Sequence, residues 1–190
     1  ALTLHLGASA QDKTTLLYTV LKSASGPSFY YTLLYSCTIA FFGWRRIQRR
    51  QTPYVTLQTT SLIFFQWLPL FILPELVLPW MGRNGFFSDG ALLRPMADLF
   101  FEAYDGGIGQ ERAYWRAYGF VLAWPLMVYN WFTHQPIWGW LVLGFLQTFV
   151  LIPLMIRRWG KGAFCGWICS CGALAETLGD THRHKMPHGP

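Results

Sequence analysis

Three of the four cysteines lie within seven residues near the C-terminal end of the chain. Cys165, Cys169 and Cys171 belong to the run Cys-Gly-Trp-Ile-Cys-Ser-Cys, which follows a long apolar stretch that ends at Arg157 and Arg158. Thiolates bind iron or zinc and exchange electrons or disulfides, and this spacing suits a small site that binds through several sulfurs. The sequence therefore predicts a redox or metal-binding segment, the thiol box (residues 165–171), at the end of an apolar helix.

A short helix is expected directly after the second of these cysteines. Ser170 is a favoured N-cap residue and Gly179 is typical of a helix C-terminal end, so the pattern predicts a helix over residues 171–178. Cys169 and Cys171 would then lie at the helix N-terminus. The helix dipole and the neighbouring basic residues are expected to favour the thiolate over the thiol there.

Three of the five histidines lie in the tail that follows, namely His182, His184 and His188. Imidazoles beside thiolates can complete a metal site, so these histidines are candidate metal ligands together with the three cysteines. A positively charged tail next to the membrane surface, without a ligand role, is the alternative interpretation.

The composition indicates a membrane protein. Hydrophobic residues make up 53% of the chain and charged residues only 13%, about half the usual charged fraction. The runs 23–44, 51–74 and 117–156 contain no Asp, Glu, Lys or Arg, and a helix needs about 20 such residues to cross a bilayer. The basic residues cap these runs and form no stripe with exposed aromatics, so we expect a lipid bilayer and no nucleic acid as partner.

The apolar runs predict an all-α integral membrane protein, a bundle of about four transmembrane helices with the short cysteine-bearing helix at the cytoplasmic edge. The expected spans cover residues 28–44, 54–73, 117–132 and 137–156. Three regions follow from this division: an N-terminal arm (1–27), a transmembrane domain (28–156, with a polar loop at 82–116), and a basic juxtamembrane region with the thiol box and the histidine-rich tail (157–190).

The two basic clusters constrain the topology. The positive-inside rule places Arg45–Arg50 in the cytoplasm. If the next three spans all cross, Arg157–Lys161 falls outside, so one of those segments is expected to be re-entrant or to lie flat. The second span is the candidate, because Pro69, Pro74 and Pro79 are expected to kink or break it.

Two reactive residues lie inside predicted spans. Glu75 falls between two of those prolines, and an acid so close to the hydrocarbon is either a proton-site or quinone-site group or a residue at the wet interface. Cys37 lies near the centre of the first span, where a single thiol is expected to serve packing.

The order of elements around the thiol box resembles the membrane domain of bacterial polyferredoxins. That order is an apolar span, a basic turn, Gly-Lys and then Cys-Gly-Trp-Ile-Cys-x-x-Gly-Ala-Leu. These proteins are associated with nitrate reductase, with nitrous-oxide reductase maturation and with cytochrome oxidase assembly. The resemblance covers roughly residues 137–180. In that family a Cys-x-x-x-Cys-Pro box follows a transmembrane helix on the cytoplasmic side, usually in two copies, with [4Fe-4S] ferredoxin modules elsewhere. It implies a thiol role for Cys165 and Cys169, a multi-pass location in a bacterial inner membrane, and a cytoplasmic thiol box.

The chain departs from that pattern in three ways. Ser170 replaces the proline and is followed by the additional Cys171, the second box is missing, and there is no Cys-x-x-Cys-x-x-Cys run. A [4Fe-4S] cluster takes four ligands, and the box supplies three. The fourth is expected from a histidine, from Cys37 or from another polypeptide, and the chain is expected to be the membrane part of a longer protein.

These observations predict a membrane-embedded electron-transfer subunit. It would pass electrons between a soluble redox partner, such as a ferredoxin-like domain, and quinone or a neighbouring subunit of a membrane redox complex. One alternative is a structural subunit of a larger energy-converting complex, and another is a metal or thiol assembly factor. A stand-alone enzyme is less expected, because there is no Gly-rich phosphate loop, nucleophile elbow or paired-histidine zinc motif.

Overall fold

The computed structural model describes residues 16–88, 90–103, 112–121 and 137–185. Within these ranges the secondary structure is helical, and the only pairing of extended residues is an isolated bridge between Ala103 and Arg112. The prediction of an all-helical chain is therefore confirmed for the described part of the protein.

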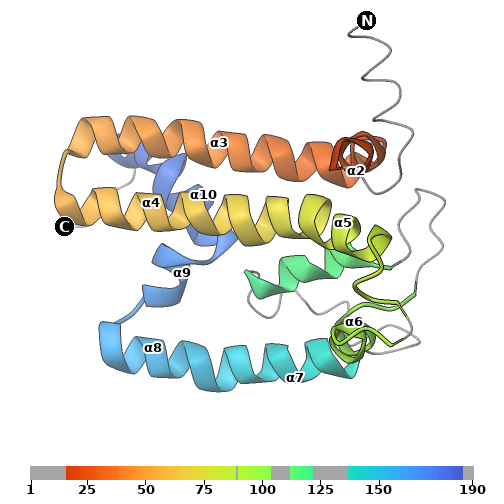
Figure 1. The fold of residues 1–190 in the computed structure, drawn as a ribbon. Helices are drawn as coiled ribbons and strands as arrows, with labels where there is room; N and C mark the ends of the chain where they lie inside the picture. Colours follow the sequence, from red (N-terminus) through yellow and green to blue (C-terminus); the bar gives the residue numbers. More distant parts are fainter. Residues whose placement is uncertain (1–15, 89, 104–111, 122–136, 186–190) are drawn as a thin grey trace, which may run out of the picture.

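Three long helical segments run in alternating directions (Figure 1). The first is α3 (Pro27–Arg50). The second consists of α4 (Pro53–Trp67), the π-helix η1 (Leu68–Val77) and α5 (Leu78–Arg83) in direct succession. The third consists of α7 (Trp138–Leu146), the π-helix η4 (Gln147–Leu151) and α8 (Ile152–Trp159). Both α3 and α4 begin with proline, whose fixed φ suits the first helical turn.

Two of these segments are long and apolar enough to cross a membrane: Pro53–Arg83, with 31 residues, and Trp138–Trp159, with 22. Only 33% and 28% of their most apolar windows are buried within the protein. Large apolar side chains therefore cover the outer surface, as a bilayer requires and water does not favour. The most exposed of them on these segments are Tyr54, Leu57, Trp138, Phe149, Leu154 and Trp159.

Four transmembrane helices are not confirmed. The predicted first span lies within α3, which does not reach the apolar character of the two segments above. The predicted span 117–132 begins in a short 3₁₀ helix, η2 (Tyr114–Phe120), which packs against η1, and residues 122–136 lie outside the described ranges.

The expected break in the second span is replaced by a change of helix type. Pro74 lies inside η1, where the wider π-helical turn accommodates a residue without an N–H, and the segment continues without interruption to Arg83. Among the described residues only two long segments follow α3, and they run in opposite directions, so the C-terminal ends of α3 and α8 lie at the same end of the molecule (Figure 1). The two basic clusters then share one side, which satisfies the positive-inside rule without a broken second span.

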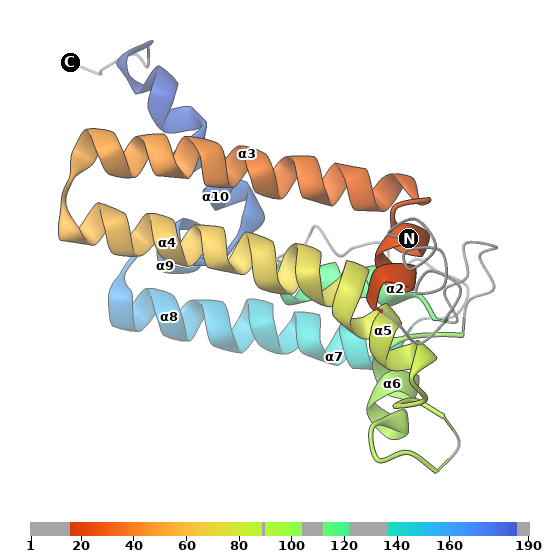
Figure 2. The same ribbon diagram turned by 45° about the horizontal axis from the view of Figure 1, so that its top comes forward.

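The C-terminal part folds back onto the long helices as three short elements: α9 (Ala163–Trp167), α10 (Ser170–Thr177) and the 3₁₀ helix η5 (Gly179–Lys185). The reversal after α8 uses Gly160 and Gly162, whose φ angles of 91° and 82° are readily available only to glycine. In consequence α9 packs against α4 and α8, and α10 packs against α4 and α3 (Figure 2).

Two apolar cores lie at opposite ends of the bundle. Ile39 of α3, Leu62 of α4 and Ala173 of α10 form the core beneath the returning C-terminal segment. The other core surrounds Tyr114 and Trp140 and includes α5, the chain after α6 (Arg94–Phe100), η2 and α7. In the N-terminal arm, α2 (Leu16–Ser23) packs on η1 near this second core, while residues 1–15 lie outside the described ranges. The division of the chain into three regions remains a prediction.

Candidate thiol site

The thiol box turns sharply between α9 and α10. Cys169 is the N-cap of α10 in an extended conformation, with φ −68° and ψ 139°. Gly172, in the first turn of α10, lies so close to the backbone carbonyl of Cys165 that a Cβ atom would clash with it. The predicted helix after the box is confirmed to within a residue, and Cys169 and Cys171 do lie at its N-terminus.

The three thiols converge on Cys169. Its side chain is buried, whereas Cys165 and Cys171 are exposed. The sulfurs of Cys165 and Cys171 both lie close enough to the Cys169 sulfur to interact with it. Sulfurs from both sides of the turn therefore surround one central sulfur, and the outer two remain open to a ligand or a partner.

The expected stabilisation of thiolates is not found. Burial, and then the neighbouring Cys169 sulfur, raise the pKa of the Cys165 and Cys171 thiols above the ordinary value. Arg158 and Lys161 were expected to act in the opposite direction, but both are exposed after the reversal of the chain. Neither side chain therefore affects the pKa of the Cys165 or Cys171 thiol.

The backbone carbonyls of the box are bound by a polar stripe on α4. Gln58 Nε2 donates to the Gly166 carbonyl at 3.1 Å, Ser61 Oγ to that of Trp167 at 3.0 Å, and Gln66 Nε2 to that of Ile168 at 3.1 Å. Gln58 and Gln66 are themselves buried, with exposures of 6% and 0%. Because the turn between α9 and α10 leaves these carbonyls without helical partners, α4 provides the hydrogen bonds that lipid cannot.

Ser170 has a different role from the predicted cap. Cys169 takes the N-cap position, and Ser170 Oγ donates to Gln66 Oε1 at 2.7 Å. The Ser170 carbonyl accepts a hydrogen bond from the Tyr35 hydroxyl of α3 at 2.6 Å. The residue in the position of the family's proline thus joins the box to both α3 and α4.

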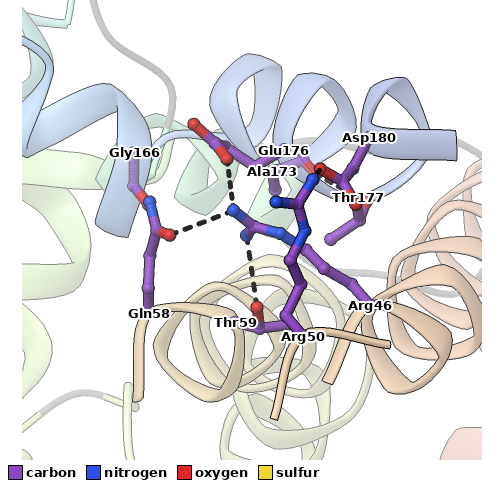
Figure 3. Close-up of polar contacts among 9 residues, drawn as sticks. All are labelled: Arg46, Arg50, Gln58, Thr59, Gly166, Ala173, Glu176, Thr177 and Asp180. Carbon is purple, nitrogen blue, oxygen red and sulfur yellow. Dashed lines mark hydrogen bonds and ion pairs between the residues drawn. The ribbon is translucent and has the colours of Figure 1, made fainter. Parts of the chain in front are cut away.

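Arg46 connects three elements beside the box (Figure 3). Its guanidinium group, 7% exposed, lies 2.6 Å from Glu176 Oε2 of α10 and donates at 3.2 Å to both Gln58 Oε1 and Thr59 Oγ1 of α4. Arg50 forms a second ion pair, with Asp180 of η5, at 2.8 Å. Two of the four arginines predicted to signal topology therefore also hold the C-terminal segment in place.

Sequence patterns alone did not identify the polar stripe. Gln58 and Gln66 are eight residues apart, which places them about 80° apart around an α-helix, within one broad face. Two amides at this spacing within an apolar run are the signal that could have shown where another segment docks.

Of the remaining candidate ligands, none whose side chain the structure describes joins the thiols. His182 is exposed in η5, His184 lies in the same element, and His188 is outside the described ranges. Cys37 is exposed on α3. Among the residues that the structure describes, no three His, Cys, Asp or Glu side chains are arranged around the position of a single metal ion.

An apolar pocket of about 450 Å³ adjoins the box between α4, α8 and α9. Trp167 forms part of its wall and makes an edge-to-face contact with Tyr54, with ring centroids 5.7 Å apart. The full lining consists of Tyr54, Ser61, Phe65, Met155, Trp159, Ala163, Trp167 and Ile168. The pocket therefore lies next to the backbone that leads into Cys169.

The donor set fits three of the four positions of a [4Fe-4S] cluster. Each thiolate of such a cluster binds a different iron, so the ligands surround the cluster from several directions rather than meeting at one ion. Three sulfurs converge at the turn, and two of them are exposed on the side from which another ligand can approach. The described residues thus offer three thiol ligands, one fewer than a [4Fe-4S] cluster takes.

Comparison with known proteins agrees with this chemistry. Residues 138–187, about a quarter of the chain, match the family described as a 4Fe-4S binding domain. A stretch of 42 residues is 45% identical to the regulatory protein NosR of Pseudomonas aeruginosa, and it covers 22% of this chain but only 6% of NosR. No solved structure matches the chain. The C-terminal part of this membrane-associated chain is therefore similar to iron–sulfur proteins, and the family match supports a [4Fe-4S] cluster as its cofactor.

Proposed function

We propose that this chain is a membrane-embedded electron-transfer subunit whose thiol box holds a [4Fe-4S] cluster at the basic end of the bundle. Cys165, Cys169 and Cys171 are its ligands within the chain. The proposal rests chiefly on the convergence of the outer two thiols on Cys169, in a turn that side chains of α3 and α4 hold in place. When bound, the cluster supplies one-electron transfer.

The protein's own residues position the ligands and restrict access to them. The amides of Gln58 and Gln66 and the hydroxyls of Ser61 and Tyr35 bind backbone carbonyls, so the sulfurs remain available for iron. Burial of Cys169 keeps water from the inner side of the site. The exposed Cys165 and Cys171 face the side from which a partner would provide the fourth ligand.

The route of the electrons is part of the same proposal. A soluble partner, such as a ferredoxin-like domain, would approach the exposed thiols on the cytoplasmic side of a bacterial inner membrane. Quinone or a neighbouring subunit would take or give electrons on the lipid side. The apolar pocket beside Trp167 supports a quinone ring at this position, because it has aromatic walls and a hydroxyl, Ser61, at its edge.

The test is the iron and acid-labile sulfide content of the purified full chain, combined with EPR spectroscopy after reduction. We expect both elements and a signal from a reduced cluster, and we expect Cys169→Ser to lose most of each. Cys37→Ser is the matched control, since that thiol lies on α3 away from the box, and should keep them. A protein that remains free of iron after anaerobic reconstitution would refute the cluster.

A thiol-redox or metal-assembly factor is the second candidate. Two exposed thiols beside a buried one also suit exchange between dithiol and disulfide, or transient binding of a metal. Mass spectrometry after mild oxidation distinguishes the two functions. An assembly factor would form a reversible Cys165–Cys169 or Cys169–Cys171 disulfide and bind metal in less than stoichiometric amounts. A structural subunit, the third candidate, would tolerate serine at all three positions.

A further inference from the structure

Glu75 is a buried carboxyl group within the longest apolar segment. Its exposure is 2%, and it lies in η1, eight residues before the end of the segment at Arg83. At about 1.5 Å per residue this is about 12 Å from that end of the helix. The site therefore lies in the half of this segment that ends at Arg83, beyond the part of the helix that contacts the thiol box.

Hydroxyl groups from two other elements surround this carboxyl. The Tyr118 hydroxyl of η2 donates a short hydrogen bond to Glu75 Oε1, and the Ser28 hydroxyl of α3 lies beside the carboxyl. Ser28 and Thr32, one helical turn apart on α3, also lie beside the Tyr118 hydroxyl. These four residues, 28, 32, 75 and 118, form a continuous polar group, which we call the carboxyl cluster.

No cation of the described chain pairs with this carboxyl. The charged residues on the elements packed against η1 are Lys22 of α2, Arg83 of α5, Arg116 of η2 and the four arginines at the C-terminal end of α3, Arg45, Arg46, Arg49 and Arg50. Those four lie more than four helical turns from Ser28, the α3 residue beside the carboxyl. Arg116 pairs with Glu102 at 2.5 Å, and the Arg83 guanidinium lies over the Tyr18 ring at 5.3 Å. Lys22 forms no ion pair with Glu75. Burying a carboxylate without a neighbouring cation has a high free-energy cost, so the protonated, neutral form of the carboxyl is the more stable one.

The cluster also has an opening. Ser28 is exposed, and it lies in the first turn of α3 at the end opposite to Arg50. A chain of hydroxyl groups thus leads from the buried carboxyl to the surface. The π-helical backbone around Glu75 is a further sign of function, because π-helical turns occur frequently at functional sites.

From these contacts we propose that Glu75 is a proton-binding site, which exchanges its proton through Tyr118 and Ser28 with the solution on the side opposite to the thiol box. Binding converts the carboxylate to the neutral acid. On release, the proton passes along the hydroxyl groups to water at the start of α3, and the carboxylate keeps the two hydroxyl groups beside it. The proposal rests on the carboxyl cluster alone and is independent of whether the thiol box binds iron.

The test uses dicyclohexylcarbodiimide, an apolar reagent that attacks protonated carboxyl groups within membranes. The full chain in liposomes is treated over a series of pH values, and the modified residue is found by peptide mass mapping. We expect labelling of Glu75 around neutral pH that falls as the pH rises, because the ionised form does not react. The pairing of Glu102 with Arg116 makes it the internal control, and it should remain unlabelled.

Two variants sharpen the result. Glu75→Asp keeps an acid and should still be labelled, while Tyr118→Phe removes a donor to the carboxylate and should move the loss of labelling to higher pH. Absence of label on Glu75 at every pH, or labelling that does not change with pH, would overturn the proposal. Because the label is located in the unmodified chain, this outcome is decisive even if a variant fails to fold.

Discussion

The two halves of the segment Pro53–Arg83 surround polar groups in different ways. In the first half, which begins at the basic end, neutral side chains of α4 bind the backbone carbonyls of the thiol box, and the reactive thiols stay available. In the second half, the protein's hydrogen bonds go to the reactive group itself, because hydroxyls from α3 and η2 surround the Glu75 carboxyl. Gln66 and Glu75 are only nine residues apart, about 13 Å along the helix.

The difference shows which part of each site depends on the bundle. The thiol box is an irregular turn, and its unpaired carbonyls are tolerated only where protein replaces water. Its chemistry then depends on an added cofactor. The carboxyl cluster needs no added group, because its hydroxyls serve both as partners and as a path for the proton. Variants at the two ends should therefore have separable effects.

The largest effect is expected from Glu176→Gln at the basic end. It leaves the buried Arg46 with only neutral partners. Because Glu176 itself is 40% exposed, we expect a cost of about 2–3 kcal/mol, within the range for a hydrogen bond to a charged group. Hydrogen exchange of the α10 amides should show this as a loss of protection. Asp180→Asn is the matched control: it leaves Arg50, whose side chain is 42% exposed and can be solvated, so the cost should be about 1 kcal/mol or less. Equal effects of the two variants would show that Arg46 does not anchor the segment.

A smaller effect is expected from Gln66→Leu. This change leaves the Ile168 carbonyl and the Ser170 hydroxyl without their partner, at a cost of about 2 kcal/mol. Loss of the support behind metal ligands also lowers affinity about 10-fold or more, so the iron content after dialysis against a chelator should fall. Gln147→Leu, on η4 outside the box, should leave iron retention unchanged. If Gln66→Leu kept all of its iron, the polar stripe on α4 would have no role in binding the cofactor.

Gly172→Ala tests the shape of the turn itself. The added methyl group meets the Cys165 carbonyl, and overpacking of this kind costs about 1–3 kcal/mol. We expect a lower iron content together with faster alkylation of Cys169, because the turn must open. Gly144→Ala on α7 has open space around the added carbon and should behave as the unmodified protein does. If Cys169 in Gly172→Ala were alkylated as slowly as in the unmodified protein, the close contact between Gly172 and the Cys165 carbonyl would be contradicted.

The smallest effect is expected at the opposite end. Tyr118→Phe removes one hydrogen bond from the carboxyl cluster and should cost about 1 kcal/mol, measured by thermal unfolding in detergent. Iron content and the EPR signal should be unchanged, since none of the cluster's residues contacts the thiol box. A loss of iron in this variant would show that the two ends are coupled.

Much of the local structure follows from the sequence. Runs without charge predict the long apolar helices, and α3, α4 and the segment that ends at Trp159 occur close to the expected positions. The helix after Cys169 was predicted to within a residue, because glycine and polar capping residues act within one turn. The family resemblance of the thiol box likewise depends only on a short contiguous motif, and the match of residues 138–187 agrees with it.

The position of the thiol box was decided by tertiary structure. Gln58, Ser61 and Gln66 meet carbonyls more than a hundred residues away in the chain, and nothing local indicates that pairing. The same is true of Arg46, whose charge predicts topology but whose partner Glu176 appears only after the chain folds back. Packing also decided the pKa of the Cys171 thiol, which burial and then the Cys169 sulfur raise, although the position at the helix N-terminus predicts a lower value.

The sequence by itself determined which segments are apolar, where helices begin and end, and which residues can bind iron or a proton. Those properties depend on residue type and on neighbours within a few positions. Only the tertiary structure decided that Pro74 is absorbed in a π-helix, that both basic clusters share one end, and that the box lies against α4. The physical reason is that backbone groups without a local partner must find one elsewhere in the bundle, and that partner is set by packing rather than by sequence distance.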